Sequence, residues 1–180
     1  MADAYRIQDQ YTAYFITLTI IDWVDVFTRK EYKDIVIDSL NYCIQHKGLQ
    51  VYEFVIMSNH LHLIISSEKE PLSGIIRDFK KFTAKRIIEA VQNIGESRRE
   101  WLLNKFAYAG SRNSNNTTYQ LWKQDYHAVQ IGTPKMLQQR REYIHQNPVR
   151  AGIVDNAEDY LYSSARFYYG RKCFIKLAAT

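Results

Sequence analysis

Short apolar runs and longer amphipathic runs alternate along the first half of this chain. The short runs are rich in β-branched and aromatic residues, which favours strands; they are Tyr14–Ile21, Val51–Ile56 and His60–Ser66. The last two runs are separated by a short segment with Ser58 and Asn59, residues that are typical of turns. We therefore expect these two strands to form a β-hairpin.

Two longer runs repeat their apolar residues with the 3.6-residue period of a helix. The run Tyr32–Lys47 is followed by Gly48, which suits a helix C-cap. The run Leu72–Ile94 carries an apolar stripe on one face. This stripe consists of Leu72, Ile75, Ile76, Phe79, Phe82 and Ile87.

A further helix is predicted from Pro134 to about Asn147. Thr133 is a good N-cap residue, and Pro134 fits the first helical position because it needs no hydrogen-bond acceptor there. We expect the helix to end before Pro148, since proline removes a helical hydrogen bond.

The remaining segments carry weaker signals. Arg98–Ala107 fits a helix, whereas Tyr119–Trp122 and His127–Ile131 are candidate strands. Gly110–Thr118 is rich in Asn, Ser and Thr and is predicted to be a flexible loop. The aromatic-rich stretch Asn156–Thr180 fits no single element.

The order strand, helix, strand, strand, helix predicts an α+β fold. The best match is a ferredoxin-like, or RRM-like, antiparallel sheet with helices packed on it. In that topology the strand that begins at His60 is central and not at an edge. The chain shows no internal repeat and no linker, so we expect residues 1–180 to form a single domain.

Charge is distributed unevenly along the chain. The net charge is +5, from 24 basic and 19 acidic residues. Between Arg77 and Arg112 there are nine basic and four acidic residues, so this segment alone accounts for the excess. A local basic excess predicts a polyanionic partner such as nucleic acid. The candidate binding residues lie opposite or beside the apolar stripe of the helix Leu72–Ile94; they are Arg77, Lys80, Lys81 and Lys85.

The sequence contains no signal for export or membrane insertion. No apolar run approaches the ~18 residues that span a bilayer, and Met1–Arg6 has no signal-peptide pattern. Cys43 and Cys173 are far apart and form no CxxC motif, so we expect both to be reduced and structural. The prediction is a cytoplasmic protein without a membrane partner.

Two histidines one residue apart, His60 and His62, are the clearest candidate for chemistry. Side chains alternate along a strand, so both imidazoles should point to one face while Leu61, Leu63 and Ile65 point to the other. Two imidazoles side by side on a stiff backbone are half of a divalent metal site.

A second candidate feature lies on the predicted helix. Tyr143 and Asn147 are four residues apart and share a helix face. If the helix lies on the histidine face of the sheet, the two imidazoles and the Asn147 amide oxygen make three neutral ligands, a set that suits Mg²⁺ or Mn²⁺ bound to a phosphate. Tyr143 would then attack phosphorus and form a covalent phosphotyrosine. Because a free phenol has a pKa near ~10, it needs the metal or a base to become a nucleophile.

Two segments resemble known family motifs. Met57–Ile65 resembles the HUH motif (histidine, hydrophobic residue, histidine) of single-tyrosine transposases, with Ser58 in place of the usual proline of the turn. Tyr143–Val154 resembles the Tyr-Ile-x-x-Asn-Pro-Val-Arg-Ala-Gly block of the REP-associated tyrosine transposases. Other family-like blocks are Ile76–Lys85, Leu121–His127 and Tyr162–Ala165. The resemblance therefore extends over most of the chain.

The resemblance implies a catalytic domain that cuts and rejoins single-stranded DNA at hairpin-bearing sites. It implies that His60 and His62 bind a divalent metal, Mg²⁺ or Mn²⁺, and that Tyr143 becomes linked to the 5′ phosphate and leaves a free 3′ hydroxyl. Asn147 corresponds to the third metal ligand, with Gln146 as its rival. The implied partner is single-stranded or hairpin DNA. Related transposases often act as dimers, so a homodimer is a candidate assembly.

Two other classes of function share parts of this pattern. A ferredoxin-like sheet that carries aromatic residues can stack bases, so a non-catalytic module that binds single-stranded nucleic acid is the main alternative. A metal-dependent phosphodiesterase that uses water would need the histidines alone. Tyr143 distinguishes a transposase from both, because neither alternative requires it.

Overall fold

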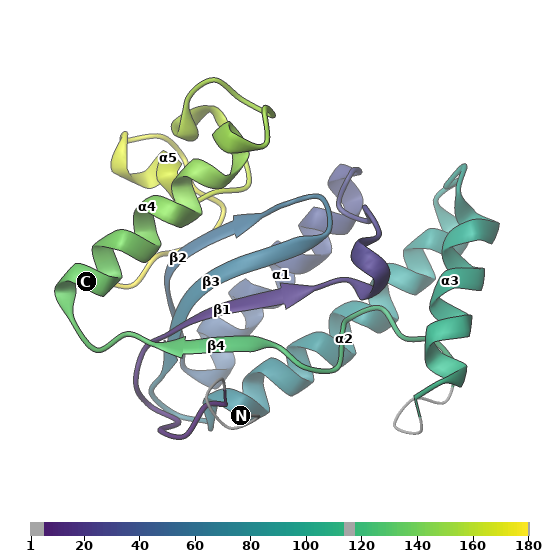
Figure 1. Ribbon diagram of the computed structural model, residues 1–180, viewed down its shortest axis with the longest axis horizontal. Coiled ribbons are helices and arrows are strands. Elements are labelled where there is room, and N and C mark those ends of the chain that lie inside the picture. The colour runs from purple at the N-terminus through teal and green to yellow at the C-terminus, as the bar shows by residue number, and fades with distance from the viewer. Residues whose placement is uncertain (1–5, 114–117, 180) are drawn as a thin grey trace.

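Four antiparallel strands form one sheet in the order β2-β3-β1-β4 (Figure 1). The computed structural model describes residues 6–113 and 118–179. Its strands are β1 (Tyr14–Thr19), β2 (Leu49–Ile56), β3 (His60–Ser67) and β4 (His127–Gln130). The hairpin of β2 and β3 is confirmed, and β3 lies inside the sheet as predicted.

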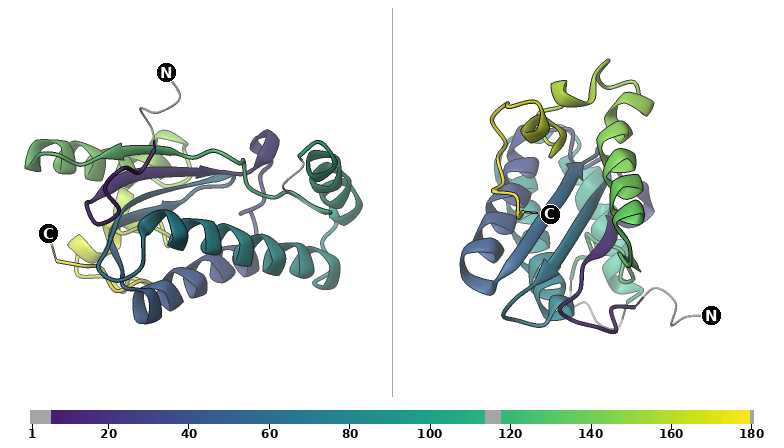
Figure 2. Two further views of the ribbon diagram at one scale, coloured as in Figure 1. Left: turned by 90° about the horizontal axis from the view of Figure 1, so that it is seen from below. Right: turned by 90° about the vertical axis from the view of Figure 1, so that its left-hand side faces the viewer.

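Helices cover the two faces of the sheet unequally. On one face α1 (Lys30–Lys47) packs beside α2 (Leu72–Asn93), and α3 (Arg99–Ser111) packs against α2 beyond the end of the sheet. On the opposite face α4 (Pro134–Arg150) lies against β2 (Figure 2). This is the predicted α+β arrangement, and it leaves much of the second face without a covering helix.

The alternation of side chains along β3 is as predicted. Leu61, Leu63 and Ile65 are all buried in the hydrophobic core. His60 and His62 lie on the face that α4 partly covers. The sequence pattern thus determines which side of the sheet carries the imidazoles.

Capping residues define the helix ends where the sequence predicts them. α1 is followed by Gly48, whose φ of 75° is left-handed; a Cβ there would lie 2.9 Å from the backbone nitrogen of Lys69. α4 begins after Thr133, whose hydroxyl accepts a hydrogen bond from the backbone N–H of Met136 at 3.2 Å. α3 and β4 confirm the weaker predictions for the second half of the chain.

Two local predictions are wrong. Phe82 is 54% exposed and does not belong to the apolar stripe. The next position faces the core instead, where the Thr83 hydroxyl is buried and donates to the carbonyl of Phe79. The segment 119–122 forms no strand, and only its last residue makes an isolated bridge, to Ile20. Tertiary packing determines the position of Phe82 and of the segment 119–122, and it overrides a weak local sequence pattern.

The predicted end of α4 is also wrong. The helix does not stop at Asn147 but continues through Pro148 to Arg150. Proline removes one hydrogen bond, but it lies in the last turn and its ring is buried. Burial of this apolar ring offsets the loss, so the helix extends by one more turn.

The stretch that fits no element in the sequence runs along the free edge of β2. The backbone N–H of Ile56 donates to the carbonyl of Tyr162 at 3.0 Å, and that of Ser164 donates to Phe54 at 2.9 Å. Two short helices lie within this stretch, η2 (Ala157–Asp159) and α5 (Ala165–Tyr168). The pairing covers an edge strand, but it has no regular period that a sequence could reveal.

The cysteines behave as predicted. Cys43 and Cys173 are free thiols. Burial raises the pKa of Cys43 to about 11, which keeps this thiol protonated and unreactive at neutral pH.

No helix within the described residues is both long and apolar enough to cross a membrane.

The loop predicted for Gly110–Thr118 is only partly described. Residues 114–117 lie outside the described residues, and the first two residues of the predicted loop belong to α3.

Candidate active site

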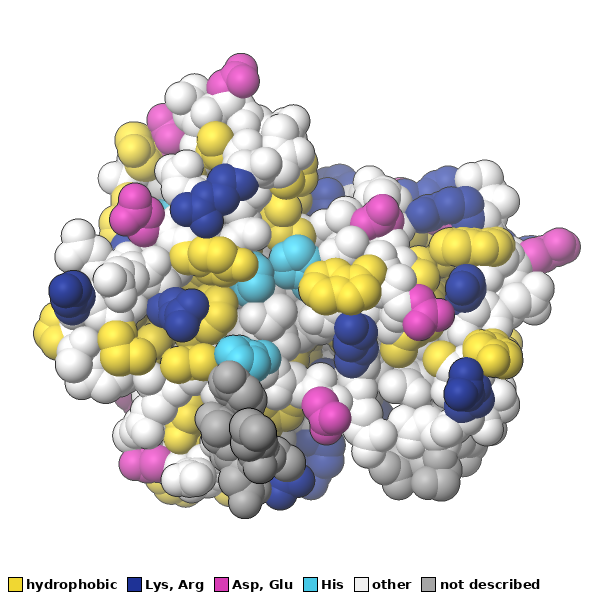
Figure 3. Space-filling model, in the orientation of Figure 1, with side chains coloured by type: hydrophobic (Ala, Val, Ile, Leu, Met, Phe, Trp, Pro, Cys, Tyr) yellow, Lys and Arg dark blue, Asp and Glu magenta, His cyan; other side chains and the backbone are white. Residues whose placement is uncertain are grey.

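The imidazoles of His60 and His62 lie side by side on the partly open face of the sheet. Their ring centroids are 4.7 Å apart, and the two rings are inclined by 71°. Figure 3 shows histidines gathered near the middle of this face, with hydrophobic side chains on both sides and Lys and Arg side chains around them. The structure therefore brings the two histidines together as the sequence predicts.

The preceding residue, Asn59, fixes the tautomer of His60. Its Oδ1 lies 2.7 Å from His60 Nδ1, while its Nδ2 donates to the carbonyl of Trp23 at 3.2 Å and to Asp25 Oδ1 at 2.8 Å. Because the amide nitrogen already serves two acceptors, Oδ1 accepts a hydrogen bond from Nδ1–H. His60 Nε2 therefore keeps a lone pair that can bind a cation.

His62 is buried beside two side chains of β1. Its cross-strand partner Thr17 places a hydroxyl 2.9 Å from Nδ1, and Phe15 stacks on the ring with a centroid distance of 5.4 Å. Burial lowers the pKa of His62 to about 3, and the charges of His60 and Arg140 act in the same direction. Burial also lowers the pKa of His60. Both imidazoles are thus neutral near pH 7, the form that binds metal ions.

α4 brings Tyr143 to the histidine pair. The Tyr143 ring meets His62 at a centroid distance of 5.2 Å and Phe15 at 5.9 Å, both in edge-on geometry. The Tyr143 side chain is 36% exposed. Packing therefore holds the phenol next to the imidazoles while leaving it accessible to a substrate.

Asn147 follows Tyr143 by one turn of α4. Its Nδ2 donates to the carbonyl of Tyr143 at 2.8 Å, so its Oδ1 is the amide atom left for a cation. Gln146 is half-buried next to it. Within residues 6–113 and 118–179, no group of three or more His, Cys, Asp or Glu side chains could hold a metal. Asn147 and Gln146 offer amide oxygens next to Tyr143 on α4, and the choice between them as the third ligand stays a prediction.

Two arginines that were not among the predicted site residues flank Tyr143. The guanidinium of Arg140 lies 4.8 Å from the ring centroid of Phe15, and that of Arg150 lies 5.7 Å from the ring centroid of Tyr143. Together with Tyr143 they line a groove of about 480 Å³. Their spacing, three residues before and seven after the tyrosine, places them on its side of the helix and was the available signal. Two guanidinium groups beside a phenol suit a phosphate group.

A buried carboxylate, Glu53 of β2, anchors α4 to the sheet. It is fully buried and accepts hydrogen bonds from Arg141 and His145 of α4 at 2.5 and 2.8 Å. Ser164 and Tyr168 of the C-terminal stretch also donate to it. Burial alone would raise the pKa of Glu53, but these hydrogen bonds hold it below its usual range.

This anchor orients the candidate nucleophile. Arg141 and His145 lie one turn apart and bind Glu53, whereas Tyr143 is two residues from each and therefore points to the other side of the helix. Fixing one side of α4 on β2 turns the opposite side toward the histidines. The sequence signal was a single acidic residue inside the apolar run of β2.

Replacing Glu53 by glutamine is expected to lower the free energy of unfolding at pH 7 by about 3 kcal/mol, because it removes the charge that Arg141 pairs with in a buried site. The depressed pKa of Glu53 stabilises the fold above the unfolded-state pKa near ~4.3. That contribution is lost as the pH falls through the folded-state pKa. The stability difference between the two proteins should therefore shrink below about pH 4. Urea titrations at several pH values measure it.

The exposed Glu68 provides a matched control. Its replacement by glutamine should change stability by less than about 0.5 kcal/mol at any of these pH values. Equal stability of the Glu53→Gln variant and the unmodified protein at pH 7 would contradict the anchoring role.

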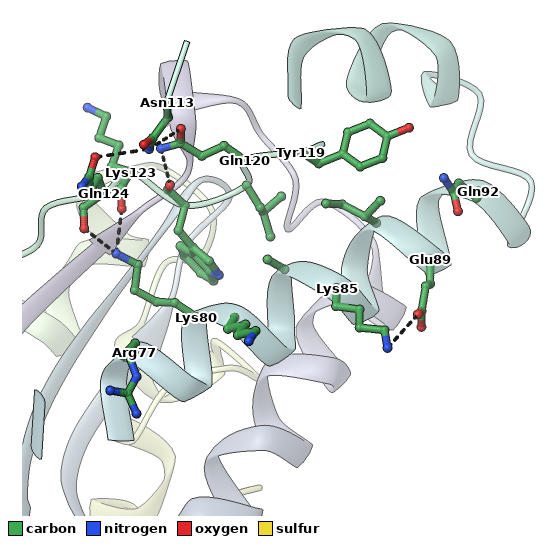
Figure 4. Close-up of a pocket in the computed structure, with 15 residues that line it drawn as sticks. Arg77, Lys80, Lys85, Glu89, Gln92, Asn113, Tyr119, Gln120, Lys123 and Gln124 are labelled. Carbon is green, nitrogen blue, oxygen red and sulfur yellow. Dashed lines mark hydrogen bonds and ion pairs between the residues drawn. The ribbon is translucent and has the colours of Figure 1, made fainter. Parts of the chain in front are cut away.

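A basic groove of about 750 Å³ lies between α2 and the segment 119–124 (Figure 4). Three exposed cations of α2 line it: Arg77, Lys81 and Lys85. Arg77 pairs with its neighbour Asp78, and Lys85 lies 4.0 Å from Glu89. Exposed pairs of this kind are weak, so these cations remain available to a polyanion.

Lys80 has a different environment from the other predicted DNA-binding residues. Its ammonium donates to the backbone carbonyls of Lys123 and Gln124 at 2.7 and 2.8 Å (Figure 4). Burial lowers the pKa of Lys80 to about 8. Lys80 therefore ties one wall of the groove to the other, and one N–H of its ammonium is left for a ligand.

Comparison of the sequence with known proteins gives a family. A family model described as "Transposase IS200 like" matches residues 10–111, more than half of the chain. The matched region contains His60 and His62, and Tyr143 lies beyond it. No curated protein matches the chain.

Solved structures resemble the fold. A REP-associated tyrosine transposase bound to a REP hairpin superposes with a TM-score of 0.62 at 16% identity, over 99% of this chain and 93% of that chain. A putative transposase from Deinococcus radiodurans R1 has a TM-score of 0.45 at 16% identity, over 78% of this chain and 95% of that chain. The likeness to the first supports the fold, and the family match rests on the sequence. The chain therefore belongs to the family of IS200-like transposases.

Proposed function

We propose that this protein cuts and rejoins single-stranded DNA beside a hairpin through a covalent bond to Tyr143. The observation that carries the proposal is the packing of the Tyr143 ring 5.2 Å from the ring of His62. This contact joins a nucleophile to a pair of neutral imidazoles. A structural relative is described as bound to a REP hairpin, which supports hairpin DNA as the substrate class.

The donor atoms of the site suit a divalent cation. His60 presents the lone pair of Nε2 because its Nδ1 is engaged with Asn59. We take His60, His62 and Asn147 as the ligands of Mg²⁺ or Mn²⁺, with Gln146 as the alternative to Asn147. When bound, the cation polarises a phosphoryl oxygen, and a neutral ligand set does not cancel its charge.

The chemical step exchanges one phosphate ester for another. The hydroxyl oxygen of Tyr143 bonds to phosphorus, and the bond from phosphorus to the 3′ oxygen breaks. The 3′ oxygen gains a proton as the phenol loses one, so the products are a 5′-phosphotyrosine and a free 3′ hydroxyl. Arg140 and Arg150 stabilise the charge on the phosphate. Attack by a 3′ hydroxyl reverses the step and rejoins a strand without an external source of energy.

A labelled hairpin oligonucleotide with single-stranded flanks tests this proposal. After incubation with the protein and Mg²⁺ or Mn²⁺, a denaturing gel should show a slow species that protease removes. A module that only binds nucleic acid gives no such species. A phosphodiesterase that uses water gives cut DNA without an adduct.

The cations of α2 are expected to bind the DNA backbone. Replacing Arg77, Lys81 and Lys85 together by glutamine should weaken binding of target and non-target hairpins alike. The slope of log affinity against log salt should fall by about 2 to 3, because each phosphate contact contributes close to one unit or somewhat less. Fluorescence anisotropy at several salt concentrations measures both.

A variant with the same loss of charge elsewhere controls this experiment. Lys69, Lys172 and Lys176 are exposed and lie outside the groove. Their replacement by glutamine should leave the salt slope nearly unchanged. If the α2 variant keeps the unmodified slope, the helix does not contact DNA.

Two further expectations concern where and how the protein acts. We expect it to act in the cytoplasm, because its proposed substrate is DNA. We also expect residues 1–180 to form a single catalytic domain.

A homodimer remains a candidate assembly. Light scattering of the purified protein, with and without hairpin DNA, measures the assembly state.

A further inference from the structure

The indole of Trp23 lies beside the histidine pair but is largely exposed. Its ring centroid is 5.8 Å from that of His60, in edge-on geometry, and 54% of the residue is accessible. Trp122, by contrast, is buried and donates its indole N–H to Thr83. A large aromatic ring left open at a candidate active site suits a flat ligand.

The backbone at Trp23 has an unusual conformation. Asp22 and Trp23, in the short helix η1 (Ile21–Trp23), both have left-handed φ values, 51° and 54°. Asp adopts this region more readily than most residues, but it is unfavourable for a residue as bulky as Trp23. The surrounding structure holds it there: the Trp23 N–H donates to the carbonyl of Ile20 at 3.2 Å, and the Trp23 carbonyl accepts a hydrogen bond from Asn59 Nδ2 at 3.2 Å. The fold thus keeps the indole in place at an energetic cost.

One side chain couples Trp23 to the candidate metal ligand. Asn59 accepts a hydrogen bond from His60 and donates one to the backbone carbonyl of Trp23 at 3.2 Å. Its second amide hydrogen binds Asp25. Asn59 therefore ties the backbone of Trp23 to the imidazole of His60, and the indole packs edge-on against that imidazole.

A cation links the indole to the basic groove. The Lys123 ammonium lies 4.6 Å from the Trp23 ring centroid. Lys123 also lines the groove along α2, where Lys80 binds its carbonyl (Figure 4). Lys123 therefore connects Trp23, which packs against His60, with a groove that has three exposed cations. An aromatic face next to a cation is the combination that binds a base and its phosphate in single strands.

We propose that Trp23 stacks on an unpaired base next to the phosphate at the His60–His62 pair. Lys123 binds a backbone phosphate of the same strand, which continues into the groove along α2. The inference rests on the proposed function, since it takes that phosphate to be the one that is cut. Stacking on an indole accepts every base, so Trp23 supplies affinity for the single strand and not its sequence.

Binding is measured with the Tyr143→Phe variant as the parent protein, so that cleavage does not interfere. The probes are a hairpin oligonucleotide with a single-stranded flank and the same hairpin with blunt ends. Trp23→Leu should weaken binding of the flanked hairpin about 10-fold, whereas Trp23→Phe, which keeps a stacking ring, should stay within about 3-fold of the parent. Neither variant should change binding of the blunt hairpin.

Trp101 of α3 is the matched control, because it is 49% exposed and outside the site. Trp101→Leu should bind both probes like the parent. Equal affinities of the Trp23→Leu variant and the parent for the flanked hairpin would overturn the proposal. An equal loss of affinity in the Leu and Phe variants would also overturn it, since stacking predicts a difference.

Tryptophan fluorescence gives an independent measure. A single-stranded oligonucleotide should quench the parent protein, and the quenching should be much smaller in Trp23→Phe and unchanged in Trp101→Phe. Unchanged quenching in Trp23→Phe would contradict stacking. These measurements do not depend on cleavage, so a protein that forms no adduct can still support the stacking proposal, and one that forms the adduct can still overturn it.

Discussion

Replacing Tyr143 by phenylalanine is expected to abolish strand cleavage and the covalent adduct, a loss of more than about 1,000-fold. Phenylalanine has no oxygen to attack phosphorus, but it keeps the ring contacts with His62 and Phe15. Stability should therefore change little. DNA binding should survive, because phosphate contacts supply much of the affinity. A denaturing gel and a mobility-shift assay on one oligonucleotide measure both properties.

Tyr126 provides the control for this prediction. Its ring packs 5.6 Å from the Lys80 ammonium and not against the histidines. Tyr126→Phe should therefore cleave DNA at the rate of the unmodified protein. Substantial cleavage by Tyr143→Phe would mean that water is the nucleophile, and the transposase chemistry proposed for this site would be wrong.

Replacing both His60 and His62 by alanine is expected to reduce metal-dependent cleavage to background. The change removes both imidazoles that are proposed to hold the cation, and calorimetry should show that the variant no longer binds Mn²⁺. The fold should persist with a loss of about 1–2 kcal/mol, since the His62 ring is buried against Phe15. Asn147→Ala should have a smaller effect than the double variant, because water can take one ligand position.

His46 of α1 is the matched histidine control, since it packs on Tyr42 at 4.6 Å and not against the histidine pair. His46→Ala should bind Mn²⁺ and cleave DNA normally. If the double variant keeps the same dependence of cleavage on metal, the cation binds elsewhere in the protein.

The features of the site that the sequence predicts are those set by local periodicity. Two histidines with a spacing of two must share a face of any strand, and Tyr143 and Asn147 with a spacing of four must share a side of any helix. The approach of Tyr143 to His62 depends in addition on where α4 packs. That placement depends on Glu53, which is 88 residues before Arg141 in the chain.

Other features were not predictable because they depend on partners far apart in the sequence. Lys80 looks like any other cation of the basic helix, but it is engaged by backbone carbonyls 43 and 44 residues away. The left-handed backbone at Trp23 follows no glycine or asparagine signal. The amide of Asn59 stabilises this backbone by donating a hydrogen bond to the carbonyl of Trp23, whereas the sequence pattern predicts only a turn at Asn59.

Mapping the covalent adduct shows directly whether Tyr143 is the nucleophile. The unmodified protein is incubated with hairpin DNA and Mn²⁺, the DNA is digested, and the peptides are analysed by mass spectrometry. We expect a nucleotide attached through phosphate to Tyr143, on a peptide from α4. A nucleotide on another tyrosine, such as Tyr119 or Tyr126, or cleaved DNA with no modified peptide at all, would contradict it.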